Sequence, residues 1–258
     1  MVYGIEKFKE YFNDFTGQYV FIGGTACSIL LEELGAEFRA TKDLDMVLLI
    51  EALDESFGVV FWKFIEDGGY EHRQKSTGKE QFYRFSKPNK PGFPAMIELF
   101  SRKPQGIDLH FDSTLTPLHL GESIASLSAV LLNDSYYDLL LEGKSVVDGY
   151  SVLGIEYILL FKIRAWLDLT QSKEIGEKID SKDVNKHKND IFRLLMNILP
   201  STIIQVNEEI NEDVELFIHR IAEEKVDLKN LGIRKYSLTD LLERIRTIYK
   251  NTTKEGTL

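Results

Sequence analysis

A pair of glycines between two apolar segments is the feature that most constrains the fold of this chain. Residues 18–22 have the composition of a buried strand, Gly23-Gly24 follows directly, and residues 25–34 have the apolar spacing of a helix that ends at Gly35. Glycine leaves backbone N–H groups accessible at the start of a helix, where an anion such as a phosphate can bind. The pattern therefore predicts a strand, a tight turn and a helix whose N-terminus is a candidate phosphate site.

Two carboxylates follow on the next predicted strand. Asp43 and Asp45 begin the apolar run at residues 44–49, and residues i and i+2 of a strand point to the same face. A D-x-D pair alone is typical of a strand edge turned to solvent. Two unpaired carboxylates on a mostly buried strand would be costly, however, and Mg²⁺ or Mn²⁺ prefers such oxygen ligands. The pair therefore predicts a divalent metal site.

Glu98 is a candidate third acid. It lies between Ile97 and Leu99 on a predicted strand over residues 95–101, which we expect to pair with a strand over residues 81–86. If the strand with Glu98 lies beside the D-x-D strand, Glu98 can ligate a second metal or accept a proton from an attacking hydroxyl. The alternatives are an edge-strand acid on an open face, or Asp108 in the third position, although Asp108 follows loop residues.

These residues together resemble a known superfamily. The glycine turn, the D-x-D strand and Glu98 are similar to the nucleotidyltransferases typified by DNA polymerase beta. Within them, Arg39-x-Thr41-x-Asp43-Leu44-Asp45 resembles the abortive-infection AbiEii-type branch, which includes toxins of type IV toxin–antitoxin systems. The resemblance implies transfer of a nucleoside monophosphate from an NTP substrate to a hydroxyl, with release of pyrophosphate. It implies tRNA or a protein as acceptor and a cognate antitoxin as partner.

The resemblance also assigns residue roles. It implies that the metal-binding and catalytic residues are Asp43, Asp45 and Glu98. It implies that the nucleotide lies near Gly23, Gly24, Thr25 and Thr41.

Three segments of the second half, at residues 161–169, 180–183 and 186–194, resemble the helical lysine and lysine–aspartate motifs of the same branch. They imply that Lys162 and Lys186 contact the nucleotide phosphates and that Asp190 lies nearby. Lys182 and Lys186 share one face of a predicted helix, and a lysine can meet a phosphate as a point charge. The alternative is a solvated lysine-rich face with an ion pair between Lys186 and Asp190.

The whole chain predicts an α/β mixed-sheet domain at residues 1–115, followed by a mostly helical domain at residues 116–258 that closes the active-site cleft. Helices are expected at residues 5–15, 57–67, 155–169, 183–199, 208–223 and 237–250. The 258 residues carry a net charge of −10, which argues against generic DNA or RNA coating. The single Cys27 and the absence of a leader or membrane-spanning pattern predict a cytoplasmic protein without membrane contact.

Two other functions fit the same residues. One is a nucleotide- or partner-binding regulator that no longer catalyses, and the other is a small-molecule nucleotidyltransferase of the aminoglycoside-modifying kind. The three acids favour catalysis, because a regulator has no need for three carboxylates on a buried sheet. Nothing in the sequence distinguishes an RNA, protein or small-molecule acceptor.

Overall fold

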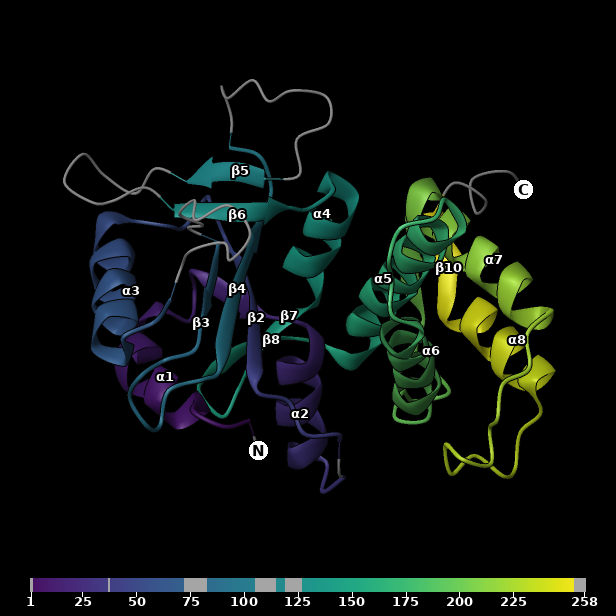
Figure 1. The fold of residues 1–258 in the computed structure, drawn as a ribbon. Coiled ribbons are helices and arrows are strands. Elements are labelled where there is room, and N and C mark those ends of the chain that lie inside the picture. Colours follow the sequence, from purple (N-terminus) through teal and green to yellow (C-terminus); the bar gives the residue numbers. More distant parts are fainter. Residues whose placement is uncertain (1, 37, 72–82, 105–114, 119–126, 253–258) are drawn as a thin grey trace. The chain divides into compact units, whose positions relative to one another are not determined.

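The computed structural model describes residues 2–36, 38–71, 83–104, 115–118 and 127–252 (Figure 1). The chain divides into two compact units, Met1–Gly154 and Ile155–Leu258. The first unit therefore extends well past residue 115, where the sequence predicts its end. The reason is that strands formed by later residues pair with strands of the N-terminal part.

A mixed sheet forms the centre of the first unit. Strand β1 (Tyr19–Phe21) pairs antiparallel with β2 (Asp43–Leu48), which pairs parallel with β4 (Met96–Ser101). The far edge of β4 is shared by β3 (Arg84–Ser86), antiparallel, and β6 (Leu127–Leu131), parallel. The remaining strands are β5 (Leu115–Leu118) beside β6, and the hairpin of β7 (Lys144–Val147) and β8 (Tyr150–Leu153), whose β8 pairs parallel with β1. The expected α/β mixed sheet is confirmed, whereas β5 and β6 were not expected.

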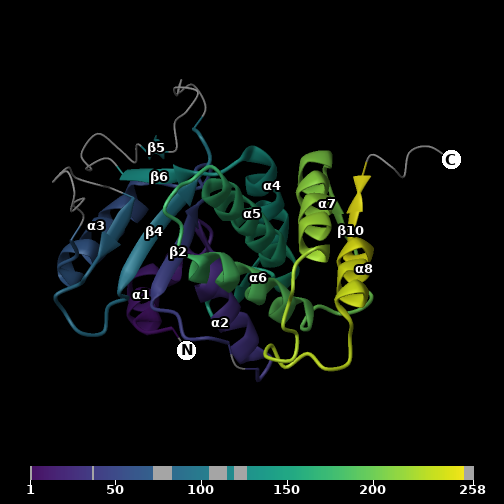
Figure 2. The same cartoon turned by 45° about the vertical axis from the view of Figure 1, so that its right-hand side comes forward.

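An aromatic layer covers one face of this sheet. Helices α1 (Ile5–Phe12) and α3 (Glu55–Gly68) lie on that side, and α2 (Gly23–Glu33) lies on the other (Figures 1 and 2). Phe8 of α1 contacts Tyr19 and Phe21 of β1 at ring-centroid distances of 5.2 and 5.0 Å, and Phe64 of α3 at 5.8 Å. A short 3₁₀ helix (Asn13–Phe15) follows α1, and α4 (Asp134–Gly143) precedes β7. The aromatic face leaves the opposite face of β2 for polar side chains.

The second unit is mostly helical. It contains α5 (Ile155–Glu174), α6 (Ser181–Leu195), α7 (Glu208–Ala222) and α8 (Leu238–Ile248), as the sequence predicts. Apolar side chains at three- and four-residue spacing form its core, and Trp166 meets Phe217 edge to face at 5.3 Å. A short parallel pair, β9 (Ile204–Val206) and β10 (Tyr249–Asn251), was not expected. None of the helices in the described ranges is both long and apolar enough to cross a bilayer.

Candidate active site

The glycine turn and the D-x-D strand meet directly. The pairing of β1 with β2 continues to a hydrogen bond from the Ile22 N–H to the Asp45 carbonyl at 3.0 Å, so the next residue, Gly23, lies against the side chain of Asp45. A Cβ added to Gly23 would lie 2.2 Å from Oδ2 of Asp45, and Gly23 has a φ of +61°. Both the contact and the backbone angle therefore require glycine at this position.

The second glycine faces the segment that leads into β2. A Cβ on Gly24 would lie 3.0 Å from Oγ1 of Thr41 and 3.6 Å from a terminal guanidinium nitrogen of Arg39. Thr41 is therefore close to the turn, as the resemblance implies. Arg39 adds a positive charge there, although the sequence assigned it no role. The sequence signal that could have assigned Arg39 to the site was its position in the motif, two residues before Thr41.

Thr25 lies deeper than the sequence suggests. Its side chain is fully buried, and its hydroxyl donates a hydrogen bond of 2.7 Å to the backbone carbonyl of Asp43. Thr25 thus ties the first turn of α2 to the start of β2. The resemblance implies that Thr25 lies near the nucleotide, whereas in the structure its hydroxyl helps to fix the position of Asp43.

The start of α2 has no side-chain cap. Its N-cap is Ile22, whose apolar side chain cannot accept a hydrogen bond from the helix, and its first turn contains no acid. By contrast, a polar N-cap side chain accepts a backbone hydrogen bond in α3, α4, α6, α7 and α8. An uncapped helix start carries partial positive charge from its N–H groups. Here that charge faces Asp45 and Arg39.

The three candidate acids share one face of the sheet. Leu44 is fully buried whereas Asp43 and Asp45 are half-buried, as expected for alternating sides of β2. Asp45 is in register with Glu98 on the parallel strand β4, so their side chains project to the same face. The predicted adjacency of the two acid-bearing strands is confirmed. The acids lie on the face away from the aromatic layer.

Glu98 has a partner that the sequence did not reveal. Arg84 is opposite Glu98 on β3, and its Nε donates to Oε1 of Glu98 at 2.9 Å, with a second, shorter contact from the guanidinium. Glu98 is 13% exposed. Within the described ranges, no group of three or more His, Cys, Asp or Glu side chains is arranged to hold a metal ion. A role for Glu98 as metal ligand or base would thus require it to leave Arg84, and it stays a prediction.

Asp43 fits a metal ligand better than Glu98 does, and Asp45 lies two residues further along the same face of β2. Among the described residues, no ion pair engages the carboxylate of Asp43. Magnesium is commonly held by one or two carboxylates together with substrate phosphates. The rival acid Asp108 lies outside the described residues, and Cys27 is buried in α2.

The predicted nucleotide residues of the second unit divide into two groups. Lys162 of α5 and Asp190 of α6 are 4% and 0% exposed and form an ion pair of 3.2 Å, with Arg193 at 3.8 Å from Asp190. This differs from the prediction that Lys162 contacts a phosphate, since it would have to leave a buried partner to do so. Lys182 and Lys186 are exposed on α6, as a phosphate contact requires.

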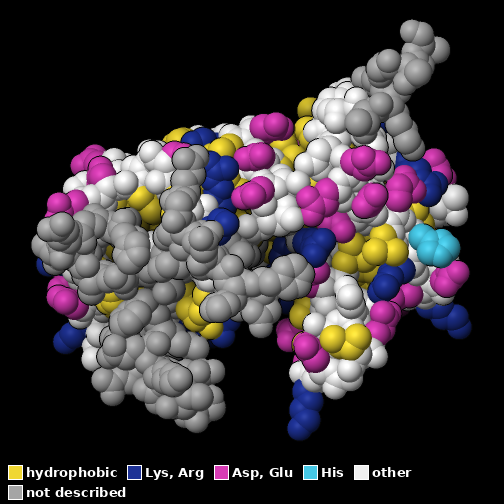
Figure 3. Space-filling model, turned by 90° about the horizontal axis from the view of Figure 1, so that it is seen from above, with side chains coloured by type: hydrophobic (Ala, Val, Ile, Leu, Met, Phe, Trp, Pro, Cys, Tyr) yellow, Lys and Arg dark blue, Asp and Glu magenta, His cyan; other side chains and the backbone are white. Residues whose placement is uncertain are grey.

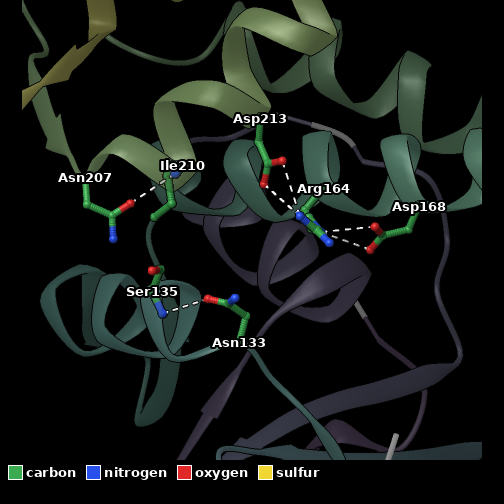
Figure 4. A network of polar contacts seen from close by, with 7 residues as sticks. All are labelled: Asn133, Ser135, Arg164, Asp168, Asn207, Ile210 and Asp213. Carbon is green, nitrogen blue, oxygen red and sulfur yellow. Dashed lines mark hydrogen bonds and ion pairs between the residues drawn. The ribbon is translucent and has the colours of Figure 1, made fainter. Parts of the chain in front are cut away.

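A second ionic network joins α5 to α7. Arg164 donates from Nη1 to both carboxylate oxygens of Asp213 at 3.2 Å, and its Nε lies 3.0 Å from Asp168 (Figure 4). Figure 4 shows the guanidinium between the two carboxylates. The motif segment at residues 161–169 therefore supplies two cations that form ion pairs within the second unit. Lys162 is buried, and Arg164 is partly exposed.

Comparison with known proteins adds little to this geometry. No family model matches the chain, and no curated protein matches it. A solved structure described as the Megavirus polyadenylate synthase matches over 86% of this chain and 36% of that chain, with 14% sequence identity and a TM-score of 0.37. The chain thus spans little more than a third of that protein's length. A likeness of this size does not bear on function.

Proposed function

We propose that the chain is a magnesium-dependent nucleotidyltransferase that transfers a nucleoside monophosphate from an NTP to a hydroxyl group. The observation that carries the proposal is the contact between the glycine turn and Asp45. In it a candidate phosphate site and a candidate metal ligand lie so close together that a single added Cβ at Gly23 would clash with Asp45. Asp45 of the D-x-D strand can occupy its position only because the residue at the glycine turn has no side chain. A pair of acids on a solvated strand would not require this fit.

Each residue then has a defined task. Asp43 and Asp45 would hold Mg²⁺, which supplies charge neutralisation at the phosphates. The N–H groups at the start of α2 and the guanidinium of Arg39 would bind phosphate oxygens. The acceptor oxygen bonds to the α-phosphorus, the bond to the β-phosphate oxygen breaks, and pyrophosphate leaves. Glu98, released from Arg84, would take the proton of the acceptor hydroxyl.

Label transfer tests this proposal. The purified protein is incubated with each NTP labelled at the α-phosphate, Mg²⁺, and total RNA or protein, and the label is located. We expect transfer with the native chain and its loss in Asp45→Asn. Asp148→Asn is the matched control, because Asp148 is an exposed turn residue of the β7–β8 hairpin with positive φ, which Asn tolerates. Equal transfer by the native chain and Asp45→Asn would exclude the proposed site.

The engaged state of Glu98 favours one alternative, a regulator that binds nucleotide without catalysis. The guanidinium of Arg84 forms a hydrogen bond with Glu98, the acid that is expected to accept the proton. The two functions differ in one result. Mg²⁺ with NTP should raise the melting temperature in both cases, because the ligand binds only the folded state. Label should move to an acceptor only if the chain is a transferase. Label on an aminoglycoside would instead indicate the small-molecule class.

For the biological role, we propose an AbiEii-type toxin that acts in the cytoplasm on tRNA or protein and is held in check by a cognate antitoxin. The motif from Arg39 to Asp45 supports this branch, since Arg39 and Thr41 both lie at the glycine turn. Induced expression should arrest growth of the host cell, and Asp45→Asn should relieve the arrest. Continued growth during expression of the native chain would argue against a toxin while leaving the transferase activity open.

A further inference from the structure

A pocket in the second unit has no role in the chemistry above. It is formed by the loop between α7 and α8, which Figure 1 shows at the yellow-green end of the chain. The pocket is an open groove with a volume of about 660 Å³. Its lining includes Lys225, Leu228, Lys229, Ile233, Arg234 and Tyr236. Cations, an aromatic ring and apolar side chains thus meet in one place.

The acids that also line this pocket are already engaged. Glu224 accepts from Nζ of Lys188 at 2.5 Å, and Asp227 accepts from the N–H and the side-chain amide of Asn230 at 3.1 and 2.7 Å. No ion pair within the described ranges uses the pocket's three cations, Lys225, Lys229 and Arg234. Lys188 neutralises Glu224, whereas the partners of Asp227 are neutral groups, so three cations face one uncompensated carboxylate and the pocket is net positive.

The wall of the pocket is held by its own backbone. The N–H of Ile233 donates to the carbonyl of Leu228 at 2.9 Å, and the N–H of Gly232 donates to that of Lys229 at 3.0 Å. Gly232 has a φ of +79°, so the turn uses a conformation that glycine adopts without strain. Ile233 is 6% exposed and forms the floor, while Tyr236 is 43% exposed. Backbone hydrogen bonds and a glycine turn thus define the wall of the pocket.

Acidic side chains outnumber basic ones on this chain, 41 to 31. The net charge is −10, and on the face in Figure 3 acidic side chains are spread over the described surface with Lys and Arg scattered among them. A local group of unneutralised cations beside an exposed tyrosine fits a ligand with both phosphates and aromatic bases. Lysine and arginine bind phosphate oxygens, and a base can stack on a tyrosine ring. An acidic peptide would satisfy the cations but would leave the ring and the apolar floor without a partner.

We propose that this pocket binds a nucleotide of single-stranded nucleic acid, and that this strand carries the acceptor hydroxyl of the reaction. The second statement rests on the proposed function, whereas the first does not. Bases in a duplex are stacked on each other and cannot reach the tyrosine. Binding is therefore selective for single strands, and it combines a salt-dependent phosphate contribution with a salt-independent stacking contribution.

The experiment measures binding of a fluorescent single-stranded RNA to the full-length protein by anisotropy, without NTP or Mg²⁺. Tyr236→Ala should weaken binding about 5- to 150-fold, the range measured for loss of one stacked base, and Tyr236→Phe should retain affinity. Lys229→Ala with Arg234→Ala should make the slope of log K against log salt shallower by about 1.4, because each phosphate contact on a single strand contributes about 0.7. All of these side chains are exposed, so the variants should fold.

Lys235→Ala is the matched control, since Lys235 is an exposed cation next to Arg234 that does not line the pocket. It should leave the affinity within twofold of the native value. The proposal is overturned by undetectable RNA binding, by equal binding of a duplex, by equal competition from polyglutamate, or by Lys235→Ala matching the double variant. RNA binding that persists in a protein with no label transfer would retain the pocket and reject only the acceptor role.

Discussion

Substituting Gly23 by alanine should damage the candidate active site far more than it damages the fold. Alanine at a positive φ costs roughly 1–2 kcal/mol, because its Cβ crowds the backbone. The larger effect is local, since the new Cβ would lie 2.2 Å from Oδ2 of Asp45 whereas ordinary contact begins at 3.4 Å. The carboxylate must therefore move by roughly 1 Å, and a displacement of that size can lower a reaction rate about 100-fold.

Gly35→Ala is the internal control for backbone strain. Gly35 follows α2 with a φ of +67°, and a Cβ there would meet nothing within 4 Å. The two variants should thus lose similar free energy of unfolding, while only Gly23→Ala should lose function. Denaturant unfolding measures the first quantity. Mn²⁺ binding followed by electron paramagnetic resonance and label transfer from NTP measure the second. Equal loss of Mn²⁺ binding and label transfer in both variants, or no loss of either activity in Gly23→Ala, would refute the idea that glycine is required at position 23 to make room for Asp45.

Three further results follow from the contacts described. Thr25→Val should lower the free energy of unfolding by about 0.5–1.5 kcal/mol, because it removes a part-buried hydrogen bond to the carbonyl at the start of β2; Thr25→Ser should recover most of the loss in denaturant unfolding. Lys162→Met should cost about 3–5 kcal/mol by removing the buried ammonium that pairs with the buried carboxylate of Asp190, and the double variant Lys162→Met/Asp190→Leu should restore most of it; a single variant as stable as the native chain would contradict the structural role. The hydrogen bond to Asp67 raises the pKa of Tyr11 to about 12, above the usual value of about 10 for tyrosine, so the bond's contribution to stability is present below pH 10 and is lost as the pH rises towards 12; Tyr11→Phe should remove one tyrosine that titrates near pH 12 in the ultraviolet difference spectrum, and a missing titration centred near pH 10 would count against the bond.

The parts of the site that local sequence determines were predictable. Glycine at the end of an apolar strand and alternating acids on the next strand each have a direct conformational meaning, and both predictions hold in the structure. The pairing of Glu98 with Arg84 was not predicted because it depends on the register between β3 and β4. The signal was present, since pairing the two predicted strands places an arginine opposite the acid in one of a few registers.

The other differences also come from long-range contacts. A buried threonine and an exposed one have the same local pattern, so the hydroxyl of Thr25 could not be assigned to the Asp43 carbonyl in advance. Lys162 lies on an apolar helix, and only the packing of α5 on α6 supplies its partner. Strands of three or four residues, such as β9 and β10, are too short to show a period. The domain boundary was set too early because nothing local indicates that β8 returns to β1.

The pairing of β8 with β1 has a consequence for the order in which this protein can be completed on the ribosome. Phe21 is in register with Val152, so one edge of β1 stays open until more than a hundred further residues have been synthesised. A contact this distant in sequence is slow to form, and an open strand edge can pair with other chains in the meantime. The glycine turn directly follows β1, so the geometry of the turn is also established late. A nascent chain that stops near residue 115 carries every acid of the candidate site but lacks the strand that closes the sheet around it.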